Sequence, residues 1–330
     1  MPSASPVVPA LPRRRWLAIT TVALLATVIA RPPAAAQAPD APDAFPRPPA
    51  TWAEVQVELS RRGFSGGPID GVRGPQSAAA LKAFQKRAGV PESGELDAAT
   101  RAVLLLEEPP FAEVALDEDD FDSLQPVGAT WLEKSQQTAL AHATALELAA
   151  ERFRTSQPFL RRLNPEVDWD ALSTESTFLA PRLPAQMRLG RAARLAIALE
   201  ARTLQVFDRD DALIAHFPVS IAKKAEKRPV GELRVIVVVA DPDYTFDPAL
   251  FSESEEARTL GRKLILPPGP NNPVGVAWIG LDRPGYGIHG TPEPEKVGRT
   301  ESHGCFRLAN WDARTLLGLV AVGTPVVVEP

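Results

Sequence analysis

Hydrophobic positions follow two different periods along the chain. Between residues 51 and 106, and again near 145–153, apolar side chains recur every three or four positions, whereas from residue 192 onward they alternate with polar ones or form short apolar runs. A period near 3.6 is typical of helices, and a period of two is typical of strands. The pattern therefore predicts a multidomain α+β protein with helical modules first and a mostly β domain last.

The first helical region has clear start and stop signals. Thr51 and Glu54 form the Thr-x-x-Glu pattern of a capping box, a Gly-rich turn follows, and a second amphipathic stretch stops at Gly89. Asp97 is placed to cap a third helix. We therefore expect a three-helix domain at 51–106.

Segments of biased composition flank this region. Residues 39–50 are rich in Pro, Ala and Asp, and residues 107–125 contain eight acidic side chains. Such a charged run repels itself, so we expect a tether at 39–50 and an extended, solvated linker at 107–125. Residues 126–190 begin with helical periodicity and form either a module or a spacer. Together with the 34 prolines, this pattern predicts a string of compact modules.

The last region, 191–330, is predicted to be mostly β. One helix is expected near 311–320, with Asn310 as its N-cap. The predicted strands lie at residues 195–199, 204–207, 213–219, 233–240, 276–281 and 325–328.

The N-terminus has the layout of an export signal. Three arginines at 13–15 precede a 15-residue apolar run at 16–30 and a small-residue stretch at 34–38. The run is shorter than the ~20 residues that cross a bilayer comfortably. We therefore expect a signal peptide at 1–38, no stable membrane span after its cleavage, and a location in the periplasm or cell wall. An uncleaved anchor and twin-arginine export are the alternatives.

Charge and cysteine content narrow the chemistry. The net charge is −5, and loss of the four arginines in the signal would take it to −9, which argues against a nucleic-acid partner. Cys305 is the single cysteine, so an intrachain disulfide is impossible. An exported protein that keeps one unpaired thiol usually keeps it for its reactivity.

The thiol has an imidazole close by in the sequence. Cys305 lies sixteen residues after His289 and two after His303. A thiol needs such a neighbour to become a nucleophile near neutral pH, because its ordinary pKa leaves it mostly protonated. The alternatives are an inert buried cysteine and a zinc site made of these three residues, whose spacing fits no common zinc pattern. We expect no metal and no cofactor.

The last domain resembles the L,D-transpeptidase catalytic domain of the YkuD type. Phe306 stands where the family has Ile or Val, so a change of pocket shape is expected. The shared residues are His289-Gly290-Thr291, Gly298, Ser302-His303-Gly304-Cys305-x-Arg307-Leu308, Asn310, Asp312 and, upstream, Pro267-Pro268-Gly269-Pro270-x-Asn272-Pro273-x-Gly275.

The helical regions resemble wall-binding modules. Residues 51–106 are similar to the peptidoglycan-binding type 1 module in their Gly63-Phe64, Gly67-Pro68-Ile69-Asp70-Gly71, Gly74, Phe84-Gln85 and Gly94-Glu95-Leu96-Asp97 segments. Residues 126–190 resemble a glycan-binding LysM module in their helix order, their Leu-x-x-x-Asn turn and the closing Ala180-Pro181. A plain structural spacer is the alternative for this second region.

These resemblances imply a reaction on peptidoglycan. Cys305 would attack the carbonyl between the third and fourth residues of a stem peptide, form a thioester and release D-alanine. An amine from a neighbouring stem would then take the acyl group, for example in 3–3 cross-linking during cell-wall remodelling. The alternatives are an L,D-carboxypeptidase and a non-catalytic protein that anchors to the wall.

The resemblance also assigns roles within the site. His289 would be the general base, with its second ring nitrogen oriented by the Gly290 carbonyl. The backbone N–H groups of His303, Gly304 and Cys305 would form the oxyanion hole, and Gly304 would allow the chain to turn there. Arg307 would hold the loop through a carboxylate such as Asp312 or bind a substrate carboxylate. Substrate-lining roles are expected for Ser302, Trp278 and Tyr286, with core packing as the alternative for the last two.

Overall fold

The computed structural model describes residues 44–185, 187–251, 254–299 and 304–330. Residues 43–330 form one compact unit. The expected signal peptide at 1–38 and the start of the expected tether lie outside the described residues. Every helix in the described part of the chain falls short of the length and apolarity that a bilayer crossing requires.

The predicted three-helix module is present. It consists of α1 (Trp52–Arg61), α2 (Pro75–Ala88) and α3 (Ala98–Val103). Thr51 and Glu54 form the expected capping box, and Asp97 accepts a hydrogen bond from Thr100 N as the cap of α3. Gly89 ends α2 in the left-handed region, at φ 70°, where a residue without a Cβ is strongly favoured.

The chain before this module is not a free tether. The backbone of Arg47 exchanges two hydrogen bonds with that of Leu106, at 3.1 and 2.8 Å, and its guanidinium pairs with Glu54 at 2.7 Å. The described residues of 39–50 are therefore joined to both ends of the module. The apolar side chain of Leu106 is fully buried, and its burial stabilises the folded position of this segment.

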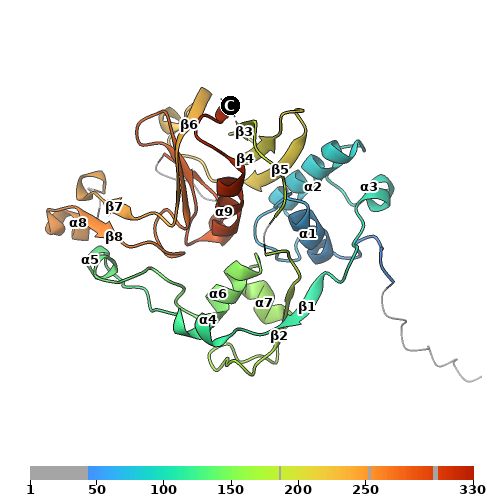
Figure 1. Ribbon diagram of the computed structural model, residues 1–330, viewed down its shortest axis with the longest axis horizontal. Helices are drawn as coiled ribbons and strands as arrows, with labels where there is room; N and C mark the ends of the chain where they lie inside the picture. The colour runs from blue at the N-terminus through green and yellow to red at the C-terminus, as the bar shows by residue number, and fades with distance from the viewer. Residues whose placement is uncertain (1–43, 186, 252–253, 300–303) are drawn as a thin grey trace, which may run out of the picture. The chain divides into compact units, whose positions relative to one another are not determined.

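The middle region is a small folded layer (Figure 1). Antiparallel strands β1 (Phe111–Val114) and β2 (Phe178–Pro181) pair with each other, and α6 (Ala145–Arg152) and α7 (Gln157–Leu163) pack beside them. Asn164, in the predicted turn, ties α7 to β2 because its side chain hydrogen-bonds both N and O of Leu179, at 2.7 and 2.9 Å. The expected helix order is confirmed, while glycan binding stays a prediction.

The prediction of an extended acidic linker is wrong. Residues 107–125 contain β1 and the short helix α4 (Glu118–Asp122), and Leu116 is fully buried. Asp120 forms an ion pair with Arg152 on α6. The apolar side chains spaced between the acids bury against the middle region, and acids in the first turn of a helix are favoured by its dipole.

Among the described residues, the largest sheet runs in the order β11-β10-β9-β6-β12-β3-β4-β5. The six predicted strands are confirmed to within two residues at each end, whereas the short β10 and β11 were not predicted. The bounds are β3 Arg194–Ala198, β4 Thr203–Phe207, β5 Leu213–Pro218, β6 Gly231–Ala240, β9 Ala277–Leu281, β10 Gly287–His289, β11 Phe306–Arg307 and β12 Pro325–Glu329.

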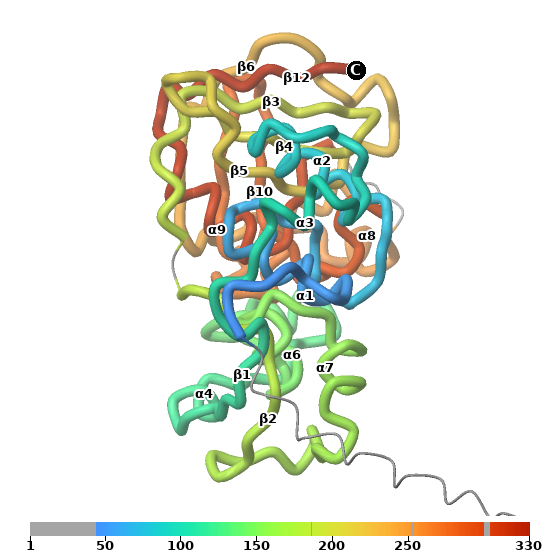
Figure 2. Tube along the Cα trace, turned by 90° about the vertical axis from the view of Figure 1, so that its right-hand side faces the viewer, coloured from blue at the N-terminus to red at the C-terminus, as the bar shows by residue number. Residues whose placement is uncertain are grey.

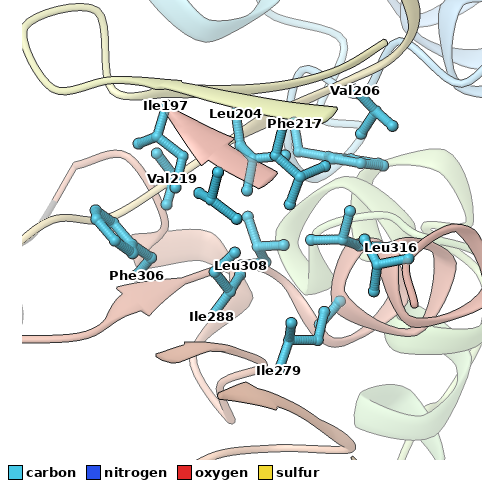
Figure 3. Close-up of a cluster of buried hydrophobic side chains, with 14 of the residues drawn as sticks. Ile197, Leu204, Val206, Phe217, Val219, Ile279, Ile288, Phe306, Leu308 and Leu316 are labelled. Atoms are coloured by element: carbon cyan, nitrogen blue, oxygen red, sulfur yellow. The ribbon is translucent and has the colours of Figure 1, made fainter. Parts of the chain in front are cut away.

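The sheet core is completed by α9 (Asn310–Leu319). Buried side chains from the strands, such as Ile197, Phe217 and Ile279, share one core with Leu316 of this helix (Figure 3). The N-cap of α9 is Ala309 rather than the predicted Asn310. Asn310 is instead the first helical residue, with a fully buried side chain.

A second, small sheet branches from the domain. Strands β7 (Tyr244–Phe246) and β8 (Leu264–Leu266) pair antiparallel, with α8 (Glu255–Leu260) between them. Trp131, from α5 (Trp131–Ser135) in the middle region, stacks on Phe246 with ring centroids 4.4 Å apart. Short 3₁₀ turns lie at Ala225–Lys227, Pro248–Leu250 and Pro294–Lys296.

The modules share cores instead of forming a string. Phe207 and Leu213 of the sheet are buried with Val55, Leu59 and Phe84 of the three-helix module, which places α2 beside β5 (Figure 2). The expectation of separate compact modules is therefore wrong for residues 43–330. Apolar side chains of the sheet that a tethered arrangement would leave in water are covered here.

Candidate active site

Two neighbouring strands bring the predicted catalytic residues together. In the parallel pair β10–β11, Ile288 lies opposite Phe306, and His289 lies opposite Arg307. Ile288 and Phe306 point into the sheet core (Figure 3), so His289 and Arg307 share the other face. Cys305 immediately precedes β11. Because Phe306 is a core residue, the expectation that it alters the pocket is not supported.

The Cys305 sulfur lies against the turn that precedes β10. It is 3.5 Å from the carbonyl oxygen of Gly285. Burial raises the pKa of the thiol, and the backbone N–H of Gly287 and the charge of Arg307 oppose this only in part. The thiol is therefore protonated at neutral pH in the resting protein.

The imidazole of His289 is buried and oriented. Its Nδ1 lies 2.6 Å from the carbonyl oxygen of Gly290, the contact expected from the sequence. A carbonyl can only accept, so Nδ1 carries the proton and Nε2 is left as an acceptor. Burial lowers the pKa of His289 to about 4; the Gly290 carbonyl opposes this shift and Arg307 adds to it.

The two pKa shifts favour the same protonation state. A lowered imidazole pKa and a raised thiol pKa both favour a neutral pair over a thiolate–imidazolium pair. The neutral Nε2 is suited to accept a proton, and the neutral thiol is suited to supply one. The thiol proton would therefore move to the imidazole during the reaction, and the two groups are neutral in the resting protein.

Arg307 does not hold the loop through Asp312. Oδ2 of Asp312 instead accepts a hydrogen bond from Ser65 Oγ at 2.9 Å. The Arg307 guanidinium makes neither a hydrogen bond nor an ion pair with any described residue, although its charge acts on Cys305, His289 and Tyr244. This arrangement favours the alternative in which Arg307 binds a carboxylate of the substrate.

Trp278 forms one wall beside the imidazole. It lies opposite His289 in the β9–β10 pairing, and the two rings stack with centroids 5.7 Å apart. A Cβ on Gly287 would come within 2.7 Å of the indole, so this glycine leaves room for the ring. Tyr286, in the adjoining turn, lies under the guanidinium of Arg283 at 4.6 Å. Trp278 is therefore a site residue, and Tyr286 is half-buried at its edge.

Tyr244, which was not predicted for the site, is influenced by the charges of two site residues. Burial raises the pKa of its phenol, and the charge of Cys305 adds to this while that of Arg307 opposes it. The residue belongs to β7, which has three residues and gives no periodic signal. The one available sequence clue was that the chain has only two tyrosines.

The side chain of Asn310 holds the end of β10 in place. Its Oδ1 accepts hydrogen bonds from Thr291 N at 3.0 Å and Val276 N at 3.4 Å, and its Nδ2 donates to Glu151 Oε2 at 3.0 Å. A Cβ on Gly290 would lie 2.2 Å from Oδ1. Only glycine allows the amide to approach the backbone that orients His289.

Comparison with known proteins identifies the domain that carries this site. Residues 192–328 match the YkuD family model, described as L,D-transpeptidase catalytic domain. This stretch is therefore similar to the catalytic domains of the YkuD family. Residues 49–104 match a second model, described as "Putative peptidoglycan binding domain". Two of the three resemblances seen in the sequence are thus confirmed, and the matched parts are called the transpeptidase domain and the peptidoglycan-binding domain below.

Named relatives carry the same description. "Putative L,D-transpeptidase YkuD" of Bacillus licheniformis is 28% identical over 185 residues, which are 56% of this chain and 93% of that protein. "Probable L,D-transpeptidase YbiS" of Escherichia coli K12 is 28% identical over 186 residues, 55% of this chain and 58% of that protein. A solved L,D-transpeptidase from Mycobacterium smegmatis has a TM-score of 0.33 at 20% identity, covering 48% of this chain and 65% of that one.

Part of the predicted oxyanion hole of the transpeptidase domain remains untested. Ser302 and His303 lie outside the described residues. A Cβ on Gly304 would meet no described atom within 4 Å. The expected steric need for glycine at this turn therefore does not come from the described neighbours of Gly304.

The expected absence of a metal at the thiol stays a prediction. In the part of the chain that the structure covers, no group of three or more His, Cys, Asp or Glu side chains could hold a metal ion. The imagined zinc site of His289, His303 and Cys305 includes a residue outside that part.

Proposed function

We propose that this protein is a peptidoglycan L,D-transpeptidase with Cys305 as its nucleophile. One observation carries the proposal: β10 and β11 bring a buried, neutral imidazole with a free Nε2 acceptor to the strand beside the only thiol. The match of residues 192–328 to the YkuD family model supports the reaction class. The thioester and the cross-link belong to the proposal.

The first half-reaction would be acylation. As the sulfur forms a bond to the carbonyl carbon of the third stem residue, the thiol proton passes to Nε2 of His289. The tetrahedral oxyanion would be stabilised by backbone N–H groups of His303, Gly304 and Cys305, each worth about 3 kcal/mol. When the C–N bond breaks, the imidazolium gives its proton to the departing D-alanine amine, and a thioester remains.

The second half-reaction would transfer the acyl group. The acceptor amine from a neighbouring stem loses a proton to Nε2 as it attacks the thioester carbon, and the leaving sulfur takes that proton back. Throughout, the Gly290 carbonyl keeps the imidazole in one orientation and stabilises its charged form. With water as acceptor the same steps give an L,D-carboxypeptidase, which is the alternative within this chemistry.

Substrate binding would use the groups around the thiol. We assign a stem carboxylate to Arg307, because a guanidinium matches a carboxylate in geometry and charge. Ser302, Trp278, Tyr286 and Tyr244 would line the peptide groove. Residues 49–104 would bind the wall, and the protein would act after export, in the periplasm or cell wall, without a stable membrane span.

The test is acylation by a carbapenem followed by intact-protein mass spectrometry. The expected result is an adduct on Cys305 that disappears in Cys305→Ala, because the thiol is the only group able to form the thioester. Treated sacculi should then yield new 3–3 linked muropeptides on digestion. If no adduct forms while sacculi still retain the protein, the non-catalytic anchoring alternative replaces the enzyme.

A further inference from the structure

The segment between His289 and Cys305 touches parts of the chain outside the transpeptidase domain. Its residues 291–299 are anchored from below by Asn310 at Thr291. Farther on, Glu295 Oε1 accepts a hydrogen bond from Gln157 N of the middle region at 3.1 Å. The described part of the segment stops at Arg299, six positions before Cys305, and resumes at Gly304. The placement of this segment therefore bears on where the thiol stands.

Gly298 is a buried point of the segment. Its φ is 73°, a value that residues with side chains rarely adopt. Ser220 Oγ accepts a hydrogen bond from its N at 3.0 Å, and Arg202 donates to its O at 3.3 Å. Both polar backbone groups of Gly298 are thus held by residues next to the sheet, Arg202 just before β4 and Ser220 just after β5.

The remaining side of Gly298 is covered by the peptidoglycan-binding domain. A Cβ on Gly298 would lie 2.5 Å from Nε2 and 2.9 Å from Cδ of Gln76. Gln76 is in the first turn of α2, and its amide therefore packs directly on the Gly298 backbone. The peptidoglycan-binding domain therefore supports this part of the catalytic segment by direct packing.

A neighbouring ion pair adds little to this contact. Arg299 lies 3.6 Å from Asp70, but two-thirds of the arginine side chain is exposed. Exposed pairs of this kind contribute little to stability. Packing of Gln76 on Gly298 is the stronger restraint, because displaced atoms in a close-packed contact have nowhere to move without strain.

We propose that Gln76 is a positioning residue for the active site, so that the peptidoglycan-binding domain sets the catalytic segment as well as contacting the wall. The inference rests on the proposed function only in using acylation of Cys305 as a readout. Gln76 Oε1 is buried and lacks a hydrogen-bond partner among the described residues. The effect therefore comes from the volume of the side chain and not from its polarity.

The experiment compares Gln76→Ala with Gln76→Met in the full chain. Carbapenem acylation is followed at several drug concentrations, which separates drug binding from the acylation rate constant. A soluble drug needs no wall binding. Gln76→Ala should lower the rate constant on the order of tenfold, because small displacements of catalytic groups cost this much. Gln76→Met, of similar length, should restore it. Lys86→Ala, exposed on the same helix, is the matched control.

Two further measurements separate the outcomes. Retention on sacculi and the urea midpoint should stay unchanged in Gln76→Ala, so that slower acylation cannot come from lost wall binding or unfolding. Equal rates in wild type and Gln76→Ala would overturn the positioning role while leaving the enzyme intact. If the wild type itself forms no adduct, alkylation of Cys305 by iodoacetamide replaces acylation, and an unchanged rate across the variants would again overturn it.

Discussion

At the scale of single residues, burial sets the chemistry of the site. His289 is 5% exposed and has a pKa lowered to about 4, while burial raises that of Cys305. The sequence predicted the pair and the Gly290 contact, because His-Gly-Thr and Ser-His-Gly-Cys are local patterns. It could not predict the resting protonation state, since desolvation depends on side chains such as Trp278 that arrive from another strand.

The resting thiol should behave as a protonated thiol. We predict that iodoacetamide alkylates Cys305 slowly near neutral pH and that the rate rises with pH beyond the range in which an exposed cysteine levels off, because the raised pKa limits the thiolate fraction. The measurement is the alkylation rate against pH, by mass spectrometry, with the urea-unfolded chain as reference. A rate that is already maximal at mildly acidic pH would reveal a preformed thiolate–imidazolium pair instead.

At the scale of elements, strand length decided what could be predicted. The six strands found from the sequence have five or more residues, whereas the strands that were missed have two to four, namely β1, β2, β7, β8, β10 and β11. So short a strand has no period, and its pairing is fixed by long-range contacts. Asn310 shows the same limit, because a helix-capping residue and a buried bridge between loops look identical in sequence. Loss of the Asn310 side chain should disturb the three places that it connects, which are the start of β9, the end of β10 and α6.

Asn310→Ala should cost both stability and rate. The substitution leaves the N–H groups of Thr291 and Val276 without their acceptor, at about 3 kcal/mol of unfolding free energy. It also releases the backbone that orients His289, so acylation should slow on the order of tenfold. Urea titration and carbapenem acylation measure the two effects.

Asn271→Ala is the matched control for this prediction. Asn271 also links the transpeptidase domain to the middle region, through Ala141 O and Glu147 at 2.8 and 2.6 Å, without touching the His289 segment. It should lose stability but keep its acylation rate. If both variants slow acylation equally, Asn310 has no specific part in orienting the imidazole.

At the scale of the whole molecule, the junction between domains carries buried titratable groups. His216 of β5 is 1% exposed, pairs through its backbone with Gly63 and Ser65, and has no hydrogen-bond partner for either ring nitrogen within the described chain. Burial lowers its pKa to about 4. The module arrangement could not be predicted from composition, because the acidic and proline-rich segments looked like spacers while their few apolar residues fold them.

His216 should make stability depend on pH. Its folded pKa lies below the unfolded 6.5, so its contribution is complete above pH 6.5 and is lost as pH falls toward about 4. Asp312 acts in the opposite sense: burial raises its pKa to about 7, with Arg154 and Ser65 opposing, so its contribution is lost as pH rises toward that value. A comparison of one variant with wild type isolates His216 from Asp312.

The His216→Leu variant should become more stable relative to the wild type as the pH falls. The difference in unfolding free energy between the two proteins should change by about 3 kcal/mol over this window, in favour of the variant at low pH. Urea titrations at a series of pH values measure it. A difference that stays constant with pH would mean that His216 titrates normally in the folded protein.

The core shared by Phe207, Leu213 and the first helices has a spatial consequence. A flexible tether would let an active site explore a radius around its anchor. Side chains interlocked across the boundary remove that freedom. If residues 49–104 bind a glycan strand, Cys305 would lie at a fixed distance from that strand. The dimensions of the protein would then determine the spacing of the bonds that Cys305 makes.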